Sequence, residues 1–156
     1  MINIAAAAAV AIALAFQAWR LISPEAQRVA LARRYPVATI SSLEKLDPPA
    51  QRLFNQYDWG GYLIERNRTK VFIDGRSEVY GDRQLDRYGA IVHLQSRWNE
   101  TLDSLGVDYV LIGRNAPLAA ALRQKGWSEI ASDSVGSLLK NPGRDTFFRS
   151  QANPRL

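Results

Sequence analysis

The chain has 156 residues, a length that fits one domain of ordinary size. It is 47% hydrophobic and includes four Trp, six Tyr and five Phe, so it has enough side chains for a buried core. The absence of cysteine excludes disulfides and cysteine-ligated zinc.

The net charge of +5 lies in the two ends of the chain. Residues 1–35 carry +3 and residues 140–156 carry +3, which leaves +5 − 6 = −1 for residues 36–139. A nucleic-acid-binding domain concentrates cations on its folded face, so no nucleic-acid partner is expected. The basic ends suit either contact with anionic lipid head groups or simple solubility.

The N-terminal segment is almost wholly apolar from Ile2 to Ala18. Residues 1–22 reach the length of about 20 apolar residues that a membrane span needs, and Trp19 and Arg20 are placed as interfacial anchors. We therefore predict a transmembrane helix over 1–22. A secretory signal peptide is an alternative, although it lacks a basic start. A buried soluble helix is another, although a small domain offers it few places to pack.

A second helix is predicted over the juxtamembrane residues 23–35. Ser23 has the character of an N-cap, Pro24 of a first helical residue, and the helix should end near Arg34. The arginines that follow the apolar segment would by themselves favour the cytoplasmic side for this part of the chain.

Residues 36–141 alternate between helical patterns and short apolar runs, which indicates an α/β domain. We expect helices from Pro36 through Leu46, Gly60–Glu65, Asp82–Gln95, Trp98–Leu105 and Pro117–Lys125, with a break at Asp47-Pro48-Pro49. We expect strands at Arg52–Asn55, Lys70–Asp74 and Asp108–Ile112, and an antiparallel hairpin of Trp127–Ala131 and Val135–Leu139.

The continuous apolar runs of the first three strands are typical of a parallel sheet that is covered on both faces. The predicted fold is therefore a small three-layer α/β domain with a mostly parallel sheet and a C-terminal antiparallel hairpin. Residues 142–156 are polar and basic, with Pro142, Gly143 and Pro154, and are expected to form a flexible tail.

Acidic residues follow the predicted strands. Asp58, Asp74, Glu78 and Asp82 lie near strand ends, where ligands of parallel sheets bind. Asp74, Glu78 and Asp82 suit Mg²⁺ binding or general-base catalysis, which makes a metal-assisted hydrolase or transferase one hypothesis. The other is that Arg76 pairs internally with Asp58, Asp74 or Asp82 and locks the fold. No nucleophile–base pair accompanies them, which weakens the catalytic hypothesis.

The candidate ligand-binding or fold-locking loop therefore consists of Asp58, Trp59, Asp74, Arg76, Tyr80 and Asp82. Trp59 and Tyr62 are expected in the core or lining a cleft, where an aromatic face can stack on a sugar ring. Gly60 and Gly61 suit close helix packing. No dinucleotide fingerprint or P-loop is present, so no cofactor is expected. His93, the one histidine, is predicted to be a packed or surface side chain.

These segments carry a resemblance to a known group of proteins. Its residues are Phe54-Asn55, Trp59-Gly60-Gly61-Tyr62-Leu63, Val71-Phe72-Ile73-Asp74-Gly75-Arg76, Tyr80-Gly81-Asp82, Leu102-Asp103, Val107-Asp108-Tyr109-Val110-Leu111, Pro117-Leu118, Leu122 and Gly126-Trp127. The chain over about 36–140 resembles the C-terminal domain of polytopic bacterial membrane proteins similar to C-type, polyprenyl-phosphate-sugar-dependent glycosyltransferases of the protein-mannosyltransferase kind.

The resemblance implies a position and a role. In that group the catalytic acid lies in an early loop among many spans, a region this chain does not contain, so no catalytic residue is carried over. The implied protein is anchored by one span in the bacterial inner membrane, with its soluble domain on the extracytoplasmic side. This orientation is opposite to the one that the arginines after the apolar segment favour. It would act as an accessory or binding domain, incomplete as an enzyme, with the lipid membrane, a polytopic subunit or a glycan as partner.

Overall fold

The computed structural model describes residues 3–46, 50, 52–67 and 70–143. The chain divides into two compact units, Met1–Arg34 and Tyr35–Leu156. The predicted break at 47–49 and residues 144–156 of the predicted tail lie outside the described residues.

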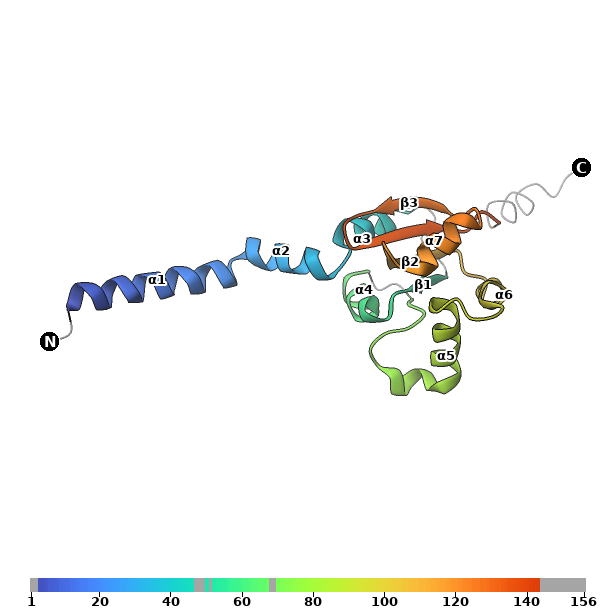
Figure 1. Ribbon diagram of the computed structural model, residues 1–156, viewed down its shortest axis with the longest axis horizontal. Helices are drawn as coiled ribbons and strands as arrows, with labels where there is room; N and C mark the ends of the chain where they lie inside the picture. The colour runs from blue at the N-terminus through green and yellow to red at the C-terminus, as the bar shows by residue number, and fades with distance from the viewer. Residues whose placement is uncertain (1–2, 47–49, 51, 68–69, 144–156) are drawn as a thin grey trace, which may run out of the picture. The chain divides into compact units, whose positions relative to one another are not determined.

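The N-terminal unit consists of two helices, α1 (Ile4–Ile22) and α2 (Pro24–Arg34) (Figure 1). The Asn3 side chain caps α1 by accepting the N–H of Ala5. Ser23 Oγ accepts the N–H of Ala26 at 3.2 Å, which confirms the N-cap predicted for the second helix. That helix ends at Arg34, as the sequence predicted.

No helix of the described chain is, taken singly, long and apolar enough to cross a membrane. By length and composition alone, the segments Ile4–Arg20 and Pro24–Arg34 meet that requirement as a pair, bent by 49° at the break between them.

The second unit contains a four-stranded mixed sheet in the order β1-β2-β4-β3. The strands are β1 (Leu53–Asn55), β2 (Tyr109–Gly113), β3 (Ser128–Ser132) and β4 (Gly136–Lys140). Only β1 and β2 are parallel, with Phe54 opposite Val110, whereas β4 is antiparallel to both β2 and β3. The predicted C-terminal hairpin is confirmed, but the prediction of a mostly parallel sheet is wrong.

The prediction of a parallel sheet was wrong because burial on both faces, from which it was inferred, does not depend on strand direction. Along β2, Val110 and Ile112 pack in one apolar cluster and Leu111 packs in another, and Leu139 and Leu138 of β4 divide between the same two clusters. A continuous apolar run therefore reports burial on both faces of a strand. Antiparallel strands covered by helices on both sides produce the same pattern.

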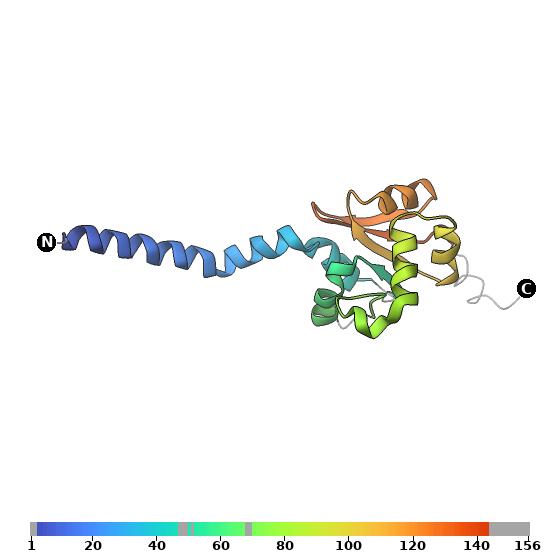
Figure 2. The same cartoon turned by 60° about the horizontal axis from the view of Figure 1, so that its bottom comes forward.

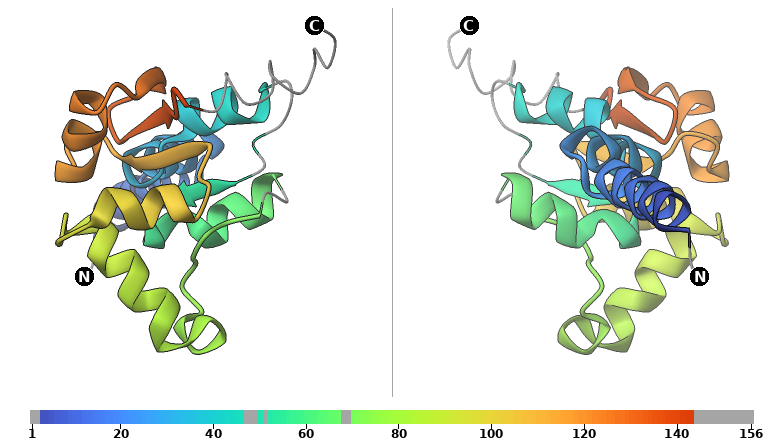
Figure 3. Two further views of the ribbon diagram at one scale, coloured as in Figure 1. Left: turned by 90° about the vertical axis from the view of Figure 1, so that its right-hand side faces the viewer. Right: turned by 90° about the vertical axis from the view of Figure 1, so that its left-hand side faces the viewer.

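Helices cover both faces of the sheet. On the face of Leu111 lie α3 (Val37–Glu44), a short 3-10 turn (Tyr57–Trp59) and α4 (Gly60–Asn67). On the face of Val110 lie α5 (Ser77–Val92), α6 (Trp98–Ser104) and α7 (Pro117–Gln124). Figure 2 shows α5 in front of the sheet, and Figure 3 shows the same helices from two further directions.

Local signals set most of the helix boundaries. Gly106 and Gly126 follow α6 and α7 with φ of 65° and 87°, a left-handed conformation that suits glycine after a helix. The helix predicted to begin at Asp82 starts earlier, at Ser77, and is interrupted by Gly81, whose φ is 68° and ψ 164°. His93 caps the other end of α5 and is exposed.

Candidate functional site

The segment Lys70–Asp74 was predicted to be a strand, but it does not join the sheet ladder. The side chain of Asn55, at the end of β1, takes the place of a neighbouring strand. Its Oδ1 accepts the N–H of Phe72 at 2.8 Å and of Ile73 at 3.4 Å, and its Nδ2 donates to the carbonyl of Ile73 at 2.8 Å. The buried amide thus binds the backbone of both residues, and the Phe72 carbonyl accepts a further hydrogen bond from Gln84 Nε2 at 3.1 Å.

One aromatic ring and one glycine pack against the same segment. The rings of Phe72 and Phe54 have centroids 4.9 Å apart. Gly60, the first residue of α4, lies so close that a Cβ built on it would be 2.2 Å from the carbonyl oxygen of Ile73. The prediction that Gly60 permits close packing is confirmed, whereas a Cβ on Gly61 would meet nothing within 4 Å.

Asp74 is the last residue of this segment and is held by Arg76. The carboxylate is only 2% exposed, while the arginine side chain is 64% exposed. Arg76 Nη2 donates to Asp74 Oδ2 at 2.6 Å, its Nε lies 3.1 Å from Oδ1, and its backbone N–H donates to Oδ1 at 2.9 Å. The structure thus selects Asp74 from the three acids proposed as partners of Arg76.

The electrostatics of this group follow from the same contacts. Hydrogen bonds from the Arg76 guanidinium lower the pKa of Asp74 to about 2, against the opposing effect of burial, and the backbone N–H of Arg76 and the Tyr80 hydroxyl add to the lowering. The Asp74 carboxylate in turn raises the pKa of Arg76. Burial, followed by the hydrogen bond to Asp74, raises the pKa of Tyr80. We refer to Asp74, Arg76 and Tyr80 as the Asp74 clasp.

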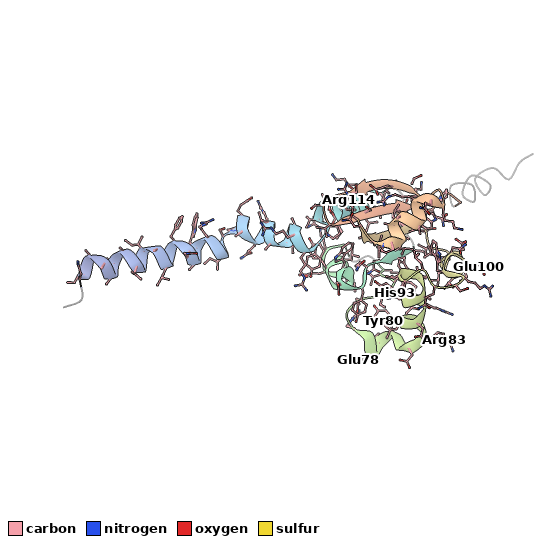
Figure 4. All side chains as sticks on the ribbon, viewed as in Figure 1. Glu78, Tyr80, Arg83, His93, Glu100 and Arg114 are labelled. Atoms are coloured by element: carbon pink, nitrogen blue, oxygen red, sulfur yellow. The ribbon has the colours of Figure 1, made fainter. Side chains whose placement is uncertain are left out.

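Among the described residues, no hydrogen bond or ion pair joins the other predicted site residues to the clasp. The Trp59 side chain is 6% exposed and packs in the core with Leu63 and Leu138. Asp58 and Asp82 are exposed, and within the described residues neither side chain forms a hydrogen bond or an ion pair. Figure 4 labels Glu78 at the outer end of α5, where its side chain is exposed.

The contacts of Asp74 bear on the catalytic hypothesis. The Asp74 carboxylate already accepts several hydrogen bonds, so it is poorly placed to act as a general base. Among the described residues, no group of three or more His, Asp and Glu side chains is placed to hold a metal ion. The structure therefore does not gather Asp74, Glu78 and Asp82 into the metal site that the enzyme hypothesis requires.

Sequence reasoning missed two features. Asn55 was placed in a predicted strand and quoted in the resemblance without a role of its own, yet a polar residue in the buried run Leu53-Phe54-Asn55 signals a specific hydrogen-bonding role. The second is a pocket of about 260 Å³ beside α6 and α7, which Trp98 and Trp127 help to line. Trp127 belongs to the main apolar cluster and Trp98 packs against it.

Comparisons with protein-family models, curated proteins and solved structures find no match to this chain. The resemblance of residues 36–140 to the C-terminal domains of membrane glycosyltransferases therefore stays a prediction from the sequence.

Proposed function

We propose that the chain is a membrane-anchored accessory or binding domain that is not a complete enzyme. In this proposal α1 lies in the bacterial inner membrane, and the α/β domain is extracytoplasmic and related to the C-terminal domain of membrane glycosyltransferases. Its role is to bind a glycan or to support a polytopic membrane subunit that contains the catalytic site.

The observation that carries this proposal is the distribution of exposed apolar side chains. Eleven large hydrophobic side chains of the described residues are exposed, and seven of them lie on α1: Ile4, Val10, Ile12, Leu14, Phe16, Trp19 and Ile22. Moving one such side chain out of water is worth about 1.5–3 kcal/mol, so leaving all seven in water is strongly unfavourable.

By length and composition only the bent pair of N-terminal helices meets the requirement for a span, and α1 by itself comes close to the thickness of a bilayer. Its 19 residues extend about 28 Å at 1.5 Å per residue, close to the hydrocarbon thickness of about 30 Å. Trp19 and Arg20 lie near its C-terminal end, where aromatic and basic side chains reach the interface.

The residues after α1 suit a membrane surface. The helix α2 has no buried residue, and Arg33 and Arg34 lie in its last turn. Cations near anionic head groups contribute about 1 kcal/mol each. The positive-inside tendency would place them in the cytoplasm, whereas the resemblance implies the opposite side, which we adopt.

The geometry of the Asp74 clasp supports the non-catalytic part of the proposal. A buried carboxylate paired with an arginine and fixed by a backbone N–H stabilises a loop, whereas a catalytic acid needs access to a substrate. No contact among the described residues favours the alternative of a metal-assisted enzyme.

Membrane attachment is tested by introducing one positive charge, either on α1 or, as a control, on the α/β domain. We expect the full chain expressed in a bacterial host to resist extraction by alkaline carbonate, and Leu14→Arg, at an exposed apolar position of α1, to release it. The matched control is Val79→Arg, because Val79 is an exposed apolar residue of the α/β domain, at 69%. Extraction of the unmodified chain into the soluble fraction would refute the anchor.

The side of the membrane is tested separately. Because the chain has no cysteine, Ser134→Cys on the exposed hairpin turn introduces a single reporter thiol. We expect a membrane-impermeant maleimide to label it in intact spheroplasts. Labelling only after lysis would place the domain in the cytoplasm.

A further inference from the structure

The pocket beside α6 and α7 lies far along the chain from the Asp74 clasp. It is lined by Trp98, Asn99, Leu102 and Asp103 of α6, by Leu122 of α7 with Lys125 and Trp127 beyond it, and by Asn141, Pro142 and Gly143 after β4. Its volume is about 260 Å³, slightly below the usual range of about 300–1,000 Å³ for small-molecule sites.

The spacing of residues along α6 explains why this helix lines the pocket with both apolar and polar side chains. Trp98 and Leu102 are four residues apart, and so are Asn99 and Asp103, so two adjacent rows of the helix border the same space. Leu102, with Leu122 and Trp127, belongs to the main apolar cluster and is almost fully buried. Asn99 is partly exposed and Asp103 is exposed.

The polar side chains differ in their availability. Asn141 is fully engaged, because its Nδ2 donates to the carbonyl of Val107 at 3.0 Å and its Oδ1 accepts the N–H of Gly143 at 3.0 Å. By contrast, the side chains of Asn99, Asp103 and Lys125 form no hydrogen bond or ion pair with any described residue. They supply an amide, a carboxylate and an ammonium group at one opening.

From this combination we propose that the pocket binds a neutral sugar ring. The indole of Trp98 offers a face for the C–H side of a pyranose, and the buried leucines form an apolar floor. Asp103 accepts hydrogen bonds from sugar hydroxyls, Lys125 donates them, and Asn99 does both.

The charges of the lining select against other ligands. Asp103 and Lys125 are the charged side chains in the lining, so its formal charge is −1 + 1 = 0. A phosphate or nucleotide needs an excess of donors and positive charge, which this opening lacks. The inference rests on the glycan-binding part of the proposed function but not on the membrane anchor, because all of the lining lies within residues 98–143.

The test is a nuclear magnetic resonance titration of the isotope-labelled full chain in phosphocholine micelles, since detergents with sugar head groups would compete. The probes are methyl glycosides of glucose, mannose, galactose and N-acetylglucosamine, added up to about 50 mM, and inorganic phosphate as a separate probe. We expect at least one glycoside to shift the indole N–H signals of Trp98 and Trp127, while those of Trp19 and Trp59 stay in place.

Two variants identify the site. Trp98→Ala and Asp103→Asn should each weaken glycoside binding by about tenfold, because one removes the stacking face and the other a charged acceptor. Asp103 is exposed, so Asp103→Asn keeps the test informative if the tryptophan variant unfolds. Asp82→Asn is the matched control, since Asp82 is exposed and equally without a described partner.

Each remaining outcome overturns the inference. Glycosides that leave both indole signals in place would show that no sugar binds in the pocket. If Asp103→Asn binds the glycosides as tightly as the unmodified chain does, any sugar site must lie outside this pocket. Phosphate shifting the same signals at lower concentration than every glycoside would make the pocket an anion site.

Discussion

Asp133 caps a helix that begins almost a hundred residues earlier in the chain. Its Oδ2 accepts the backbone N–H of Thr39 at 3.1 Å, across 94 positions of sequence, and Thr39 lies in the first turn of α3. The residue at the N-cap of that helix is Pro36, which makes no side-chain cap. The hairpin turn thus supplies the side-chain cap that the N-terminus of α3 lacks in its own sequence.

The same carboxylate also organises its own turn. Asp133 Oδ1 accepts the N–H groups of Val135 and Gly136, each at 2.9 Å. Burial by itself raises the pKa of Asp133, but these N–H groups and that of Thr39 outweigh burial and hold the pKa below its usual value. One side chain therefore joins the hairpin to α3.

The first prediction concerns this link. Asp133→Ala should lower the free energy of unfolding by about 2 kcal/mol, because it removes a helix cap and two turn hydrogen bonds. Urea unfolding of the full chain in mild detergent measures it. Ser134→Ala, at the exposed neighbour, should change stability by less than about 0.5 kcal/mol. Equal stability of the two variants would contradict the capping role.

The second prediction uses the two adjacent glycines. Gly60→Ala should destabilise the domain by about 1–3 kcal/mol, because its Cβ would meet the backbone of Ile73 and Asp74. Gly61→Ala should be neutral or stabilise α4 by up to about 1 kcal/mol, since nothing lies within 4 Å of that Cβ. Thermal unfolding of both variants measures these changes in stability. If Gly60→Ala is as stable as the unmodified chain, α4 does not approach the Ile73 backbone this closely.

The third prediction concerns Asn55 and the segment it fixes. In Asn55→Asp the acceptor for the N–H of Phe72 is kept, but the donor to the Ile73 carbonyl is lost and a charge is buried. We expect a loss of about 1–3 kcal/mol. Asn55→Leu should in addition speed hydrogen exchange at the Phe72 amide. Exchange that is already fast in the unmodified chain would show that Asn55 does not fix this segment.

The fourth prediction is a pH dependence of the Asp74 clasp. Asp74→Asn should lower the free energy of unfolding by about 1–2 kcal/mol near neutral pH, a range reduced for the solvent around the exposed Arg76. The folded-state pKa of Asp74, about 2, lies below the ordinary value of 3.8. The contribution is therefore fully present above the ordinary pKa and is lost as the pH falls through about 2.

Acid titration of the two proteins checks that sign. The stability difference between the unmodified chain and Asp74→Asn should stay constant from pH 7 to about 5 and shrink toward zero near pH 2. Asp82→Asn should leave stability near neutral pH unchanged, because Asp82 is exposed and has no described partner. A difference that persists unchanged at pH 2 would mean that charge is not what Asp74 contributes.

Much of the local structure was predictable because its causes are local. Ser23 and Pro24 define the start of α2, Pro117 defines the start of α7, and Gly106 and Gly126 follow helix ends with positive φ. These signals act within one turn of helix, so neighbouring residues suffice to read them. The pairing of Arg76 with an acid was among the expected alternatives, and its partner lies only two residues away.

The tertiary structure alone decided how these elements assemble. The strand β4 runs antiparallel to β2. The apolar runs of the two strands would be equally buried if β4 ran the other way, so the sequence pattern does not determine its direction. The segment at Ile73 fails to become a strand because the Asn55 side chain occupies its hydrogen-bonding groups. Contacts across such distances leave no periodic trace in the sequence, since each depends on one side chain meeting a remote backbone.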